Sequence, residues 1–206
     1  MISIVDYGVG NLFSLRCSLD YLGYESCLVS DRESLHNATK IILPGVGAFG
    51  DAAQALVGSG LVPPLMDAAM RGVPLLGICV GMQLLFEEGF EYGRHNGLGL
   101  LKGGVHPMQD DLAALGLTHK VPQIGWNALK TNNDLSPIMA STINGEYMYF
   151  VHSYYAKCAD EQVIAETEYG VRVPAVVGRG NVFGSQFHPE KSGEAGLRFL
   201  RGFCEM

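Results

Sequence analysis

The sequence predicts an α/β fold: an open, mostly parallel, twisted sheet flanked by helices, with antiparallel strands in the C-terminal half. Short apolar runs alternate in the first half with segments whose apolar residues recur at helical spacing. These runs show no polar–apolar alternation, which is typical of strands covered on both faces. In the second half, strand-like runs follow one another with short turns between them. The series therefore predicts a doubly wound sheet, in which ligands bind beyond the carboxyl ends of the strands.

The elements of the first half follow from residue type and spacing. Leucines at helical spacing predict a helix over residues 12–22. Residues 49–62 and 63–72 predict one or two further helices, the second with prolines where a helix can begin. Four short apolar runs predict the strands of the parallel sheet: 2–5, 25–30, 40–45 and 73–78.

The second half is richer in strand-like sequence. Four runs predict strands that extend the sheet in antiparallel fashion: 147–155, 162–169, 174–180 and 181–188. A helix over residues 193–206 is predicted to close the chain. The sequence contains no repeat and no linker, and its 206 residues fit the ~200–250 that one domain usually spans. We therefore expect a single domain over residues 1–206.

Composition and charge exclude several classes of function. The net charge is −7 and no basic cluster occurs, which argues against binding to nucleic acid. No apolar run reaches the ~18 residues of a membrane span, and the N-terminus lacks the features of a signal peptide, so we expect a cytoplasmic protein. The five cysteines are scattered without a C-x-x-C pair, which predicts reduced thiols and no zinc site. We expect no metal and no cofactor.

One cysteine lies between two glycines, directly after a predicted buried strand. Cys79 has Gly77 two residues before it and Gly81 two residues after it, and residues 82–88 are predicted to continue as a helix. A sharp turn from strand to helix is the geometry of a nucleophile elbow, which exposes one side chain at the edge of the sheet. The amide of Val80 could then hold an oxyanion. The alternative is a buried cysteine in an ordinary tight turn.

A cysteine nucleophile needs a base, and His188 is the better candidate for this role. It ends a predicted strand and precedes a proline, which favours an extended backbone. In an extended segment Glu190 emerges on the same side as His188 and could orient the imidazole ring. His152 lies in a strand-like run and could instead be a core or interface histidine. The other histidines have polar or turn-like neighbours and are predicted on the surface: His36, His95, His106 and His119.

Two glycine-rich turns follow predicted strands. In the segment Pro44–Gly47, glycines permit backbone amides to turn toward a ligand, as an oxyanion pocket requires. The segment 6–11 has Gly8 and Gly10 but lacks the third glycine of a dinucleotide fingerprint, so no nucleotide site is predicted. Because an acid follows the candidate base at once, the order of the parts also disfavours an α/β-hydrolase.

Taken together, the motifs PGVG, LGICVGMQ and QFHPE resemble those of the class I, triad-type glutamine amidotransferases, whose sheet is flavodoxin-like. The resemblance covers nearly the whole chain and implies one type 1 glutamine amidotransferase domain. Secondary motifs are similar to those of the glutaminase subunits of imidazole glycerol phosphate synthase, which serve histidine biosynthesis. These motifs are DYGVGN, PQIGWN, YFVHSYY and FHPEKS.

The resemblance implies a role for each matching residue. Cys79 would attack the side-chain amide of glutamine, His188 would act as the base, and Glu190 would orient His188. The backbone amides of the oxyanion hole would come from Val46, Gly47 and Val80. Glutamine itself would be contacted by Gly47, Gln83, Glu91, Ser153 and Tyr154. The products would be glutamate and ammonia.

The resemblance also implies a partner, because ammonia released into water at neutral pH is largely protonated. In the family this partner is a (β/α)8 cyclase subunit, which forms a heterodimer with the glutaminase and produces imidazole glycerol phosphate and an aminoimidazole carboxamide ribotide. Its ligand activates the glutaminase, and a peptide flip in the PGVG segment is one hypothesis for the switch. The docking face would carry Asn11, Trp126, His152 and Lys191. For Trp126, the alternative is packing in the core.

Three other functions remain open at this point. The chain could be a class I glutaminase subunit that serves anthranilate, aminodeoxychorismate, carbamoyl phosphate or pyridoxal synthesis. It could be a cysteine-dependent hydrolase or chaperone of the related glyoxalase-like group. It could also be a non-catalytic binding subunit, although Cys79, His188 and Glu190 are all present.

Overall fold

The computed structural model describes residues 1–132 and 136–206 and has a mixed sheet of eight strands at its centre. The strand order is β2-β1-β3-β4-β14-β13-β12-β9. The parallel part contains β1 (Ile2–Val5), β2 (Ser26–Val29), β3 (Ile41–Gly45), β4 (Leu75–Cys79) and β14 (Val182–Ser185). The antiparallel part contains β13 (Arg172–Arg179), β12 (Val163–Glu168) and β9 (Lys130–Thr131). The predicted fold class is therefore confirmed.

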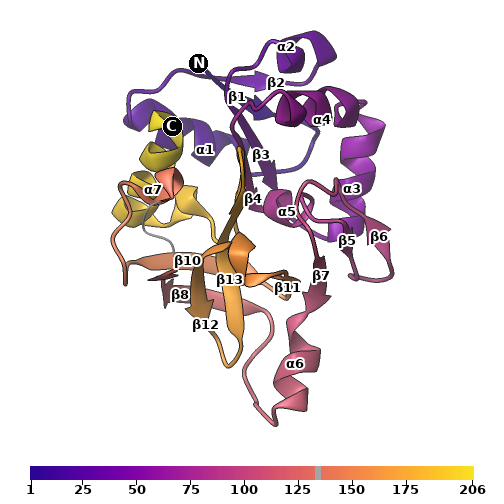
Figure 1. Ribbon diagram of the computed structural model, residues 1–206, viewed down its shortest axis with the longest axis vertical. Helices are drawn as coiled ribbons and strands as arrows, with labels where there is room; N and C mark the ends of the chain where they lie inside the picture. Colours follow the sequence, from indigo (N-terminus) through magenta and orange to yellow (C-terminus); the bar gives the residue numbers. More distant parts are fainter. Residues whose placement is uncertain (133–135) are drawn as a thin grey trace.

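Helices lie on both sides of the parallel strands (Figure 1). One side carries α1 (Leu12–Tyr21) and α7 (Gly193–Glu205), and the other carries α3 (Phe49–Gly58) and α5 (Val80–Gln83). Further helices are α2 (Arg32–His36), α4 (Val62–Met70) and α6 (Met108–Ala114). Short 3₁₀ turns span Pro137–Met139, Asp160–Gln162 and Pro189–Lys191. Buried β1, β3 and β4 form the centre of the core.

Two smaller sheets lie beside the main one. The first pairs β10 (Tyr147–His152) with β8 (Gln123–Ala128) in antiparallel fashion. The second has the order β11-β7-β5-β6 and contains β11 (Tyr154–Lys157), β7 (Gly104–Pro107), β5 (Glu88–Gly89) and β6 (His95–Asn96). The single strand predicted over 147–155 is therefore divided at Ser153, and its two halves belong to different sheets. Neither half extends the main sheet.

The predicted helix after Cys79 is much shorter than expected. Helix α5 ends at Gln83, where the sequence predicted helix through residue 88. The carbonyl groups of Leu84, Leu85 and Phe86 accept hydrogen bonds from the backbone of residues 98–101 instead of from a following helical turn. A helix of four residues carries little dipole, so α5 contributes little to stabilising a negative charge on Cys79.

The closing helix α7 fixes the loop that carries His188. Its buried face contains Phe199, Leu200 and Phe203. Phe199 packs edge to face on Phe187 with ring centroids 5.0 Å apart, and Phe187 packs in the same way on Phe150 of β10 at 5.7 Å. This aromatic row joins α7, the segment before His188 and β10 into one packed unit.

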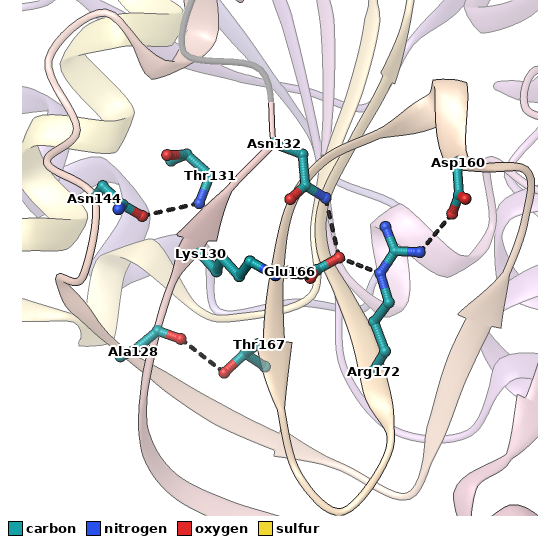
Figure 2. A network of polar contacts seen from close by, with 9 residues as sticks. All are labelled: Ala128, Lys130, Thr131, Asn132, Asn144, Asp160, Glu166, Thr167 and Arg172. Atoms are coloured by element: carbon teal, nitrogen blue, oxygen red, sulfur yellow. Dashed lines mark hydrogen bonds and ion pairs between the residues drawn. The ribbon is translucent and has the colours of Figure 1, made fainter.

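A charged network holds the outer edge of the main sheet (Figure 2). The nearly buried carboxylate of Glu166 on β12 accepts hydrogen bonds from Lys130 at 3.2 Å, from Asn132 at 3.0 Å and from Arg172. Arg172 also pairs with Asp160. Burial raises the pKa of Glu166, but these donors outweigh it and the net shift is downward. The network ties the two-residue strand β9 to β12 and β13.

Replacing Glu166 with glutamine should lower the free energy of unfolding by about 1–2 kcal/mol, because Arg172 and Lys130 lose the largely buried carboxylate with which they pair. The loss stays moderate because Arg172 and Lys130 are exposed enough to be solvated. Lys130→Gln, which removes only an exposed cation, should cost less than about 1 kcal/mol. Urea denaturation of both variants measures the difference. Equal stabilities for the two variants would show that the network contributes nothing beyond a surface pair.

No helix in residues 1–132 and 136–206 is long and apolar enough to cross a membrane.

Candidate active site

Cys79 lies at the strained junction between β4 and α5. Its backbone has φ 54° and ψ −113°, and it is one of two non-glycine residues with positive φ among those the structure describes. An L-residue in this region is costly, and such strain persists only where the surrounding structure enforces it. The side chain is buried but lines a cavity beyond the carboxyl edge of the sheet. The predicted elbow geometry is therefore present.

The two flanking glycines permit close approach of the backbone rather than an unusual backbone conformation. A Cβ atom on Gly81 would lie 1.9 Å from the carbonyl oxygen of Leu43, and one on Gly77 would lie 2.6 Å from the carbonyl oxygen of Gly81. Neither has positive φ, in contrast to Cys79 between them. Because backbone atoms cannot swing aside as flexible side chains do, only glycine lets α5 turn back against β3 and β4.

His188 and Glu190 form a buried ion pair beside the cysteine. Nδ1 of His188 is 2.8 Å from Oε1 of Glu190, and both side chains are only 3% exposed. Asn11 donates a weaker hydrogen bond to the same carboxylate oxygen at 3.4 Å. Burial lowers the pKa of His188, but contacts with Cys79 and Glu190 outweigh it and raise the value to about 9. The imidazole ring is therefore protonated at neutral pH.

The main chain around His188 is fixed to strand β10. The amide of His188 donates to the carbonyl of Tyr149 at 3.0 Å. The hydroxyl of Ser192 donates to the carbonyl of His188 at 2.6 Å and accepts from the amide of Tyr149 at 3.0 Å. Any displacement of β10 would therefore be transmitted directly to the histidine.

A cavity of about 400 Å³ brings most of the predicted site residues together. Its wall contains the predicted nucleophile and base, Cys79 and His188. The predicted oxyanion and substrate residues also line it, and so do two of the predicted interface residues. The lining is Val46, Gly47, Cys79, Val80, Gln83, Glu91, Pro122, Val151, His152, Ser153, Tyr154, His188 and Lys191.

Two of the predicted substrate residues have defined hydrogen bonds. The side-chain amide of Gln83 donates to the carbonyl of Tyr154 and to Oε1 of Gln186, each at 3.1 Å. Oε2 of Glu91 accepts from the amide of Phe49 at 2.7 Å, at the N-terminus of α3. The carboxylate of Glu91 is thus placed to attract a cation, and the side-chain amide of Gln83 is held against the wall of the cavity.

The PGVG segment is supported from the side of β1. The hydroxyl of Tyr7 donates to the carbonyl of Pro44 at 2.8 Å. Burial, and then the charge of the nearby Cys79, raise the pKa of Tyr7. A Cβ atom on Gly45 would lie 2.5 Å from the amide nitrogen of Gly81, so β3 and the elbow are in close contact. Gly47 follows with a φ of 86°, a conformation that favours glycine.

The four predicted interface residues lie in different environments. Trp126 is 52% exposed, with its ring 5.9 Å from that of Tyr149, so the alternative of packing in the core is wrong. Lys191 is exposed at the mouth of the cavity, and Asn11 is partly buried against Glu190. His152 is buried in the cavity wall instead of lying on an outer face, because it shares the inward face of β10 with Phe150.

Sequence reasoning missed two residues next to the cysteine. Gln186 is fully buried, and its side-chain nitrogen lies 3.9 Å from the sulfur of Cys79. Its place in the motif QFHPE, two residues before His188, is the signal that could have found it. Tyr7 lies in the motif DYGVGN, but nothing in the sequence indicated that its hydroxyl would reach the PGVG segment.

The sequence profile of the glutamine amidotransferase class-I family matches residues 3–205. A solved structure named as a glutamine amidotransferase superposes with a TM-score of 0.76 at 22% identity, covering 100% of this chain and 98% of the other. PurLQS from Thermotoga maritima gives a TM-score of 0.75 at 24% identity, covering 99% of this chain and 97% of the other. The chain belongs to the class-I glutamine amidotransferase family.

Within that family the chain groups with proteins named imidazole glycerol phosphate synthase subunit HisH. The protein of that name from Caldanaerobacter subterraneus subsp. tengcongensis is 46% identical, over 100% of this chain and 98% of the relative. The one from Lactiplantibacillus plantarum is 48% identical, over 100% of this chain and 96% of the relative.

Proposed function

We propose that this chain is the glutaminase subunit of an imidazole glycerol phosphate synthase and that it hydrolyses glutamine through Cys79, His188 and Glu190. The observation that carries the proposal is the meeting of a strained elbow cysteine with His188 in one cavity, where the carboxylate of Glu190 is buried against the His188 ring. The relatives named HisH support the choice of synthase, because they are 45–48% identical over nearly their whole length.

In the first step the sulfur of Cys79 attacks the side-chain carbonyl carbon of glutamine. A thiolate is the reactive form of cysteine, and the imidazole of His188 is the group that holds the proton. Gln186 directs an N–H toward the sulfur and favours its negative charge. The carbonyl oxygen becomes an oxyanion, for which the amides of Val80 and of Val46 and Gly47 are the candidate donors.

In the second step the carbon–nitrogen bond breaks. The C=O bond re-forms, the electron pair of the C–N bond stays on nitrogen, and His188 gives that nitrogen its proton, so ammonia leaves and a thioester of Cys79 remains. Glu190 keeps the His188 ring oriented throughout. Neutral His188 then takes a proton from a water molecule, whose oxygen attacks the thioester carbon. The carbon–sulfur bond breaks with its electron pair on the sulfur of Cys79, and the released carboxylic acid loses its proton to solvent as glutamate.

An exposed apolar surface supports a protein partner. On the outer face of the β8–β10 sheet, Ile124, Trp126 and Tyr147 are each more than half exposed. Single exposed apolar residues are ordinary, but a group that includes the only tryptophan favours an interface. Val151, on the same face, lines the cavity, and Lys191 lies at its mouth. We infer that a (β/α)8 cyclase subunit covers this surface and receives ammonia directly.

The test is a glutaminase assay of the full chain, alone and with the cyclase subunit and its ribonucleotide ligand. We expect glutamate release to rise strongly only with the liganded cyclase. A matched assay with a chorismate-using synthase partner should give no activation. A high rate for the isolated chain would contradict regulation by the partner, and activation by the other synthase would assign the chain to a different glutaminase.

The pH dependence of the reaction follows from the environment of His188. Its pKa of about 9 predicts that kcat/KM falls on the alkaline side near pH 9, as the ring loses the proton needed by the leaving nitrogen. Glu190 stabilises the charged ring, so Glu190→Ala should lower this pKa and move the alkaline limb to lower pH. A pH–rate profile of both proteins measures the shift. An unchanged limb would mean that Glu190 does not act on the proton of His188.

A further inference from the structure

His152 is a buried histidine that has no role in the proposed steps of glutamine hydrolysis. Its side chain lies on the inward face of β10 and lines the same cavity as Cys79 and His188. The residue is only 6% exposed. A polar ring buried this deeply is expected to have both of its nitrogens satisfied by hydrogen bonds.

Among the residues that the structure describes, only one of the two ring nitrogens of His152 has a hydrogen-bond partner. Nδ1 lies 2.9 Å from the carbonyl oxygen of Tyr154, and because a carbonyl can only accept, Nδ1 carries the hydrogen. Burial lowers the pKa of His152 to about 4, so the ring is neutral at physiological pH. Nε2 is therefore a bare acceptor, and it is buried without a partner among the residues that the structure describes.

A second bare acceptor lies on the neighbouring strand. Gln123 of β8 is directly opposite His152 in the β8–β10 ladder and is fully buried. Asn127 donates to the carbonyl of Glu168 at 3.3 Å, which directs its own oxygen toward the side-chain nitrogen of Gln123 at 2.9 Å. The amide orientation of Gln123 is thereby fixed, and its Oε1 is buried without a donor in the described part of the chain.

The complementary ligand carries N–H groups and no competing negative charge. The amide nitrogen of glutamine carries two such groups, and ammonia carries three. We propose that Nε2 of His152 accepts a hydrogen bond from the amide nitrogen of glutamine as it becomes ammonia, and that Oε1 of Gln123 is the next acceptor along the exit. This inference rests on the proposed glutaminase function.

The proposed contact leaves the proton balance of the reaction unchanged. The carbon–nitrogen bond breaks and the proton still comes from His188, while His152 only accepts a hydrogen bond. Because Nδ1 keeps its hydrogen on Tyr154 and Nε2 has none to give, ammonia leaves in its neutral, nucleophilic form. A bare acceptor also disfavours the carboxylate of glutamate, which has no N–H group, and so assists release of that product.

The two acceptors point out a direction for the exit. Pro122 and Val151, the neighbours of Gln123 and His152 in the chain, line the cavity. The next residue of β8, Ile124, is already exposed on the outer apolar surface. His152 and Gln123 lie opposite each other on the inward face of the β8–β10 pair, whose outward face carries Ile124 and Trp126, so the inference places ammonia against the two strands on which we place the cyclase.

The test compares two replacements of His152 in the complex with the liganded cyclase. His152→Gln places an amide group near the position of Nε2, whereas His152→Asn keeps a group near Nδ1 and removes the acceptor. Glutamate release and cyclase product are measured together, and their ratio gives the coupling. His152→Asn should lower kcat about tenfold, the equivalent of one hydrogen bond, with KM little changed, and should lower the coupling. His152→Gln should retain most of the wild-type kcat and most of the coupling.

Gln123→Met provides a second variant. It keeps the length of the side chain and removes the acceptor that ammonia would meet after the carbon–nitrogen bond has broken. It should leave glutamate release unchanged and lower the coupling. Cyclisation driven by added ammonium salt should be the same in all variants, and the exposed His36→Asn serves as the matched control. Wild-type kcat and coupling in His152→Asn, or equal loss in His152→Gln and His152→Asn, would overturn the inference. Absence of glutamate release by the wild-type complex would overturn the proposed function instead.

Discussion

Replacing Cys79 with alanine should abolish glutamine hydrolysis and leave binding of the cyclase intact. Loss of a triad member in hydrolases of this kind lowers kcat by a factor on the order of 10⁴ or more. Binding should persist because Cys79 is buried in the cavity wall, whereas the candidate interface residues Trp126 and Lys191 are exposed. Glutamate release and sedimentation of the complex measure the two properties.

Cys27→Ala provides the matched control for this variant. Cys27 lies on β2, at the far edge of the main sheet from the antiparallel strands, and its side chain is only partly buried. Its replacement should leave the glutaminase rate unchanged. Residual hydrolysis in Cys79→Ala at a level comparable with this control would contradict the role of Cys79 as the nucleophile.

Replacing Gly81 with alanine should have the largest effect on folding. The new Cβ would lie 1.9 Å from the carbonyl oxygen of Leu43 and 3.0 Å from the carbonyl carbon of Pro44, both in β3. Relief of this clash requires the elbow and β3 to separate, which should cost about 3 kcal/mol or more, or prevent folding. Because Gly45 packs against the same turn, separation would also move the PGVG segment away from Cys79.

Gly58→Ala tests whether the effect is specific to the elbow. Gly58 is the last residue of α3, and a Cβ atom there meets nothing within 4 Å. Alanine should be neutral or should raise the free energy of unfolding by about 0.4–1 kcal/mol, since it restricts the unfolded chain. Denaturant unfolding of both variants gives the comparison. Equal stability of Gly81→Ala and the wild type would show that the elbow is not a close contact.

Much of the site could be predicted because its parts are local in sequence. Cys79 is defined by two nearby glycines, and Glu190 follows His188 at a spacing that turns both side chains the same way. The parallel strands were equally accessible, since unbroken apolar runs indicate burial on both faces. The reason for Gly81 could not be predicted, because it depends on the short distance between Gly81 and the backbone of Leu43 in another strand.

The features that prediction missed depend on contacts between distant segments. Helix α5 is short because carbonyl groups at residues 84–86 bond to residues 98–101, and no local pattern indicates that pairing. The strand predicted over 147–155 changes sheet at Ser153 although its composition is uniform. The sequence left open whether His152 is a core or an interface histidine, and its burial depends on how β10 packs against Phe187. Tertiary structure decides each of these cases.

Hydrolysis by this mechanism requires that Cys79 forms a covalent γ-glutamyl thioester during turnover. The most direct measurement mixes the chain and the liganded cyclase with glutamine, quenches with acid and determines by mass spectrometry which cysteine peptide carries a glutamyl group. We expect the glutamyl adduct on the peptide that contains Cys79, and a stable adduct on the same cysteine when glutamine is replaced by an electrophilic glutamine analogue. Continued release of glutamate with an adduct on another cysteine, or with none on Cys79 after the analogue has stopped the reaction, would contradict it.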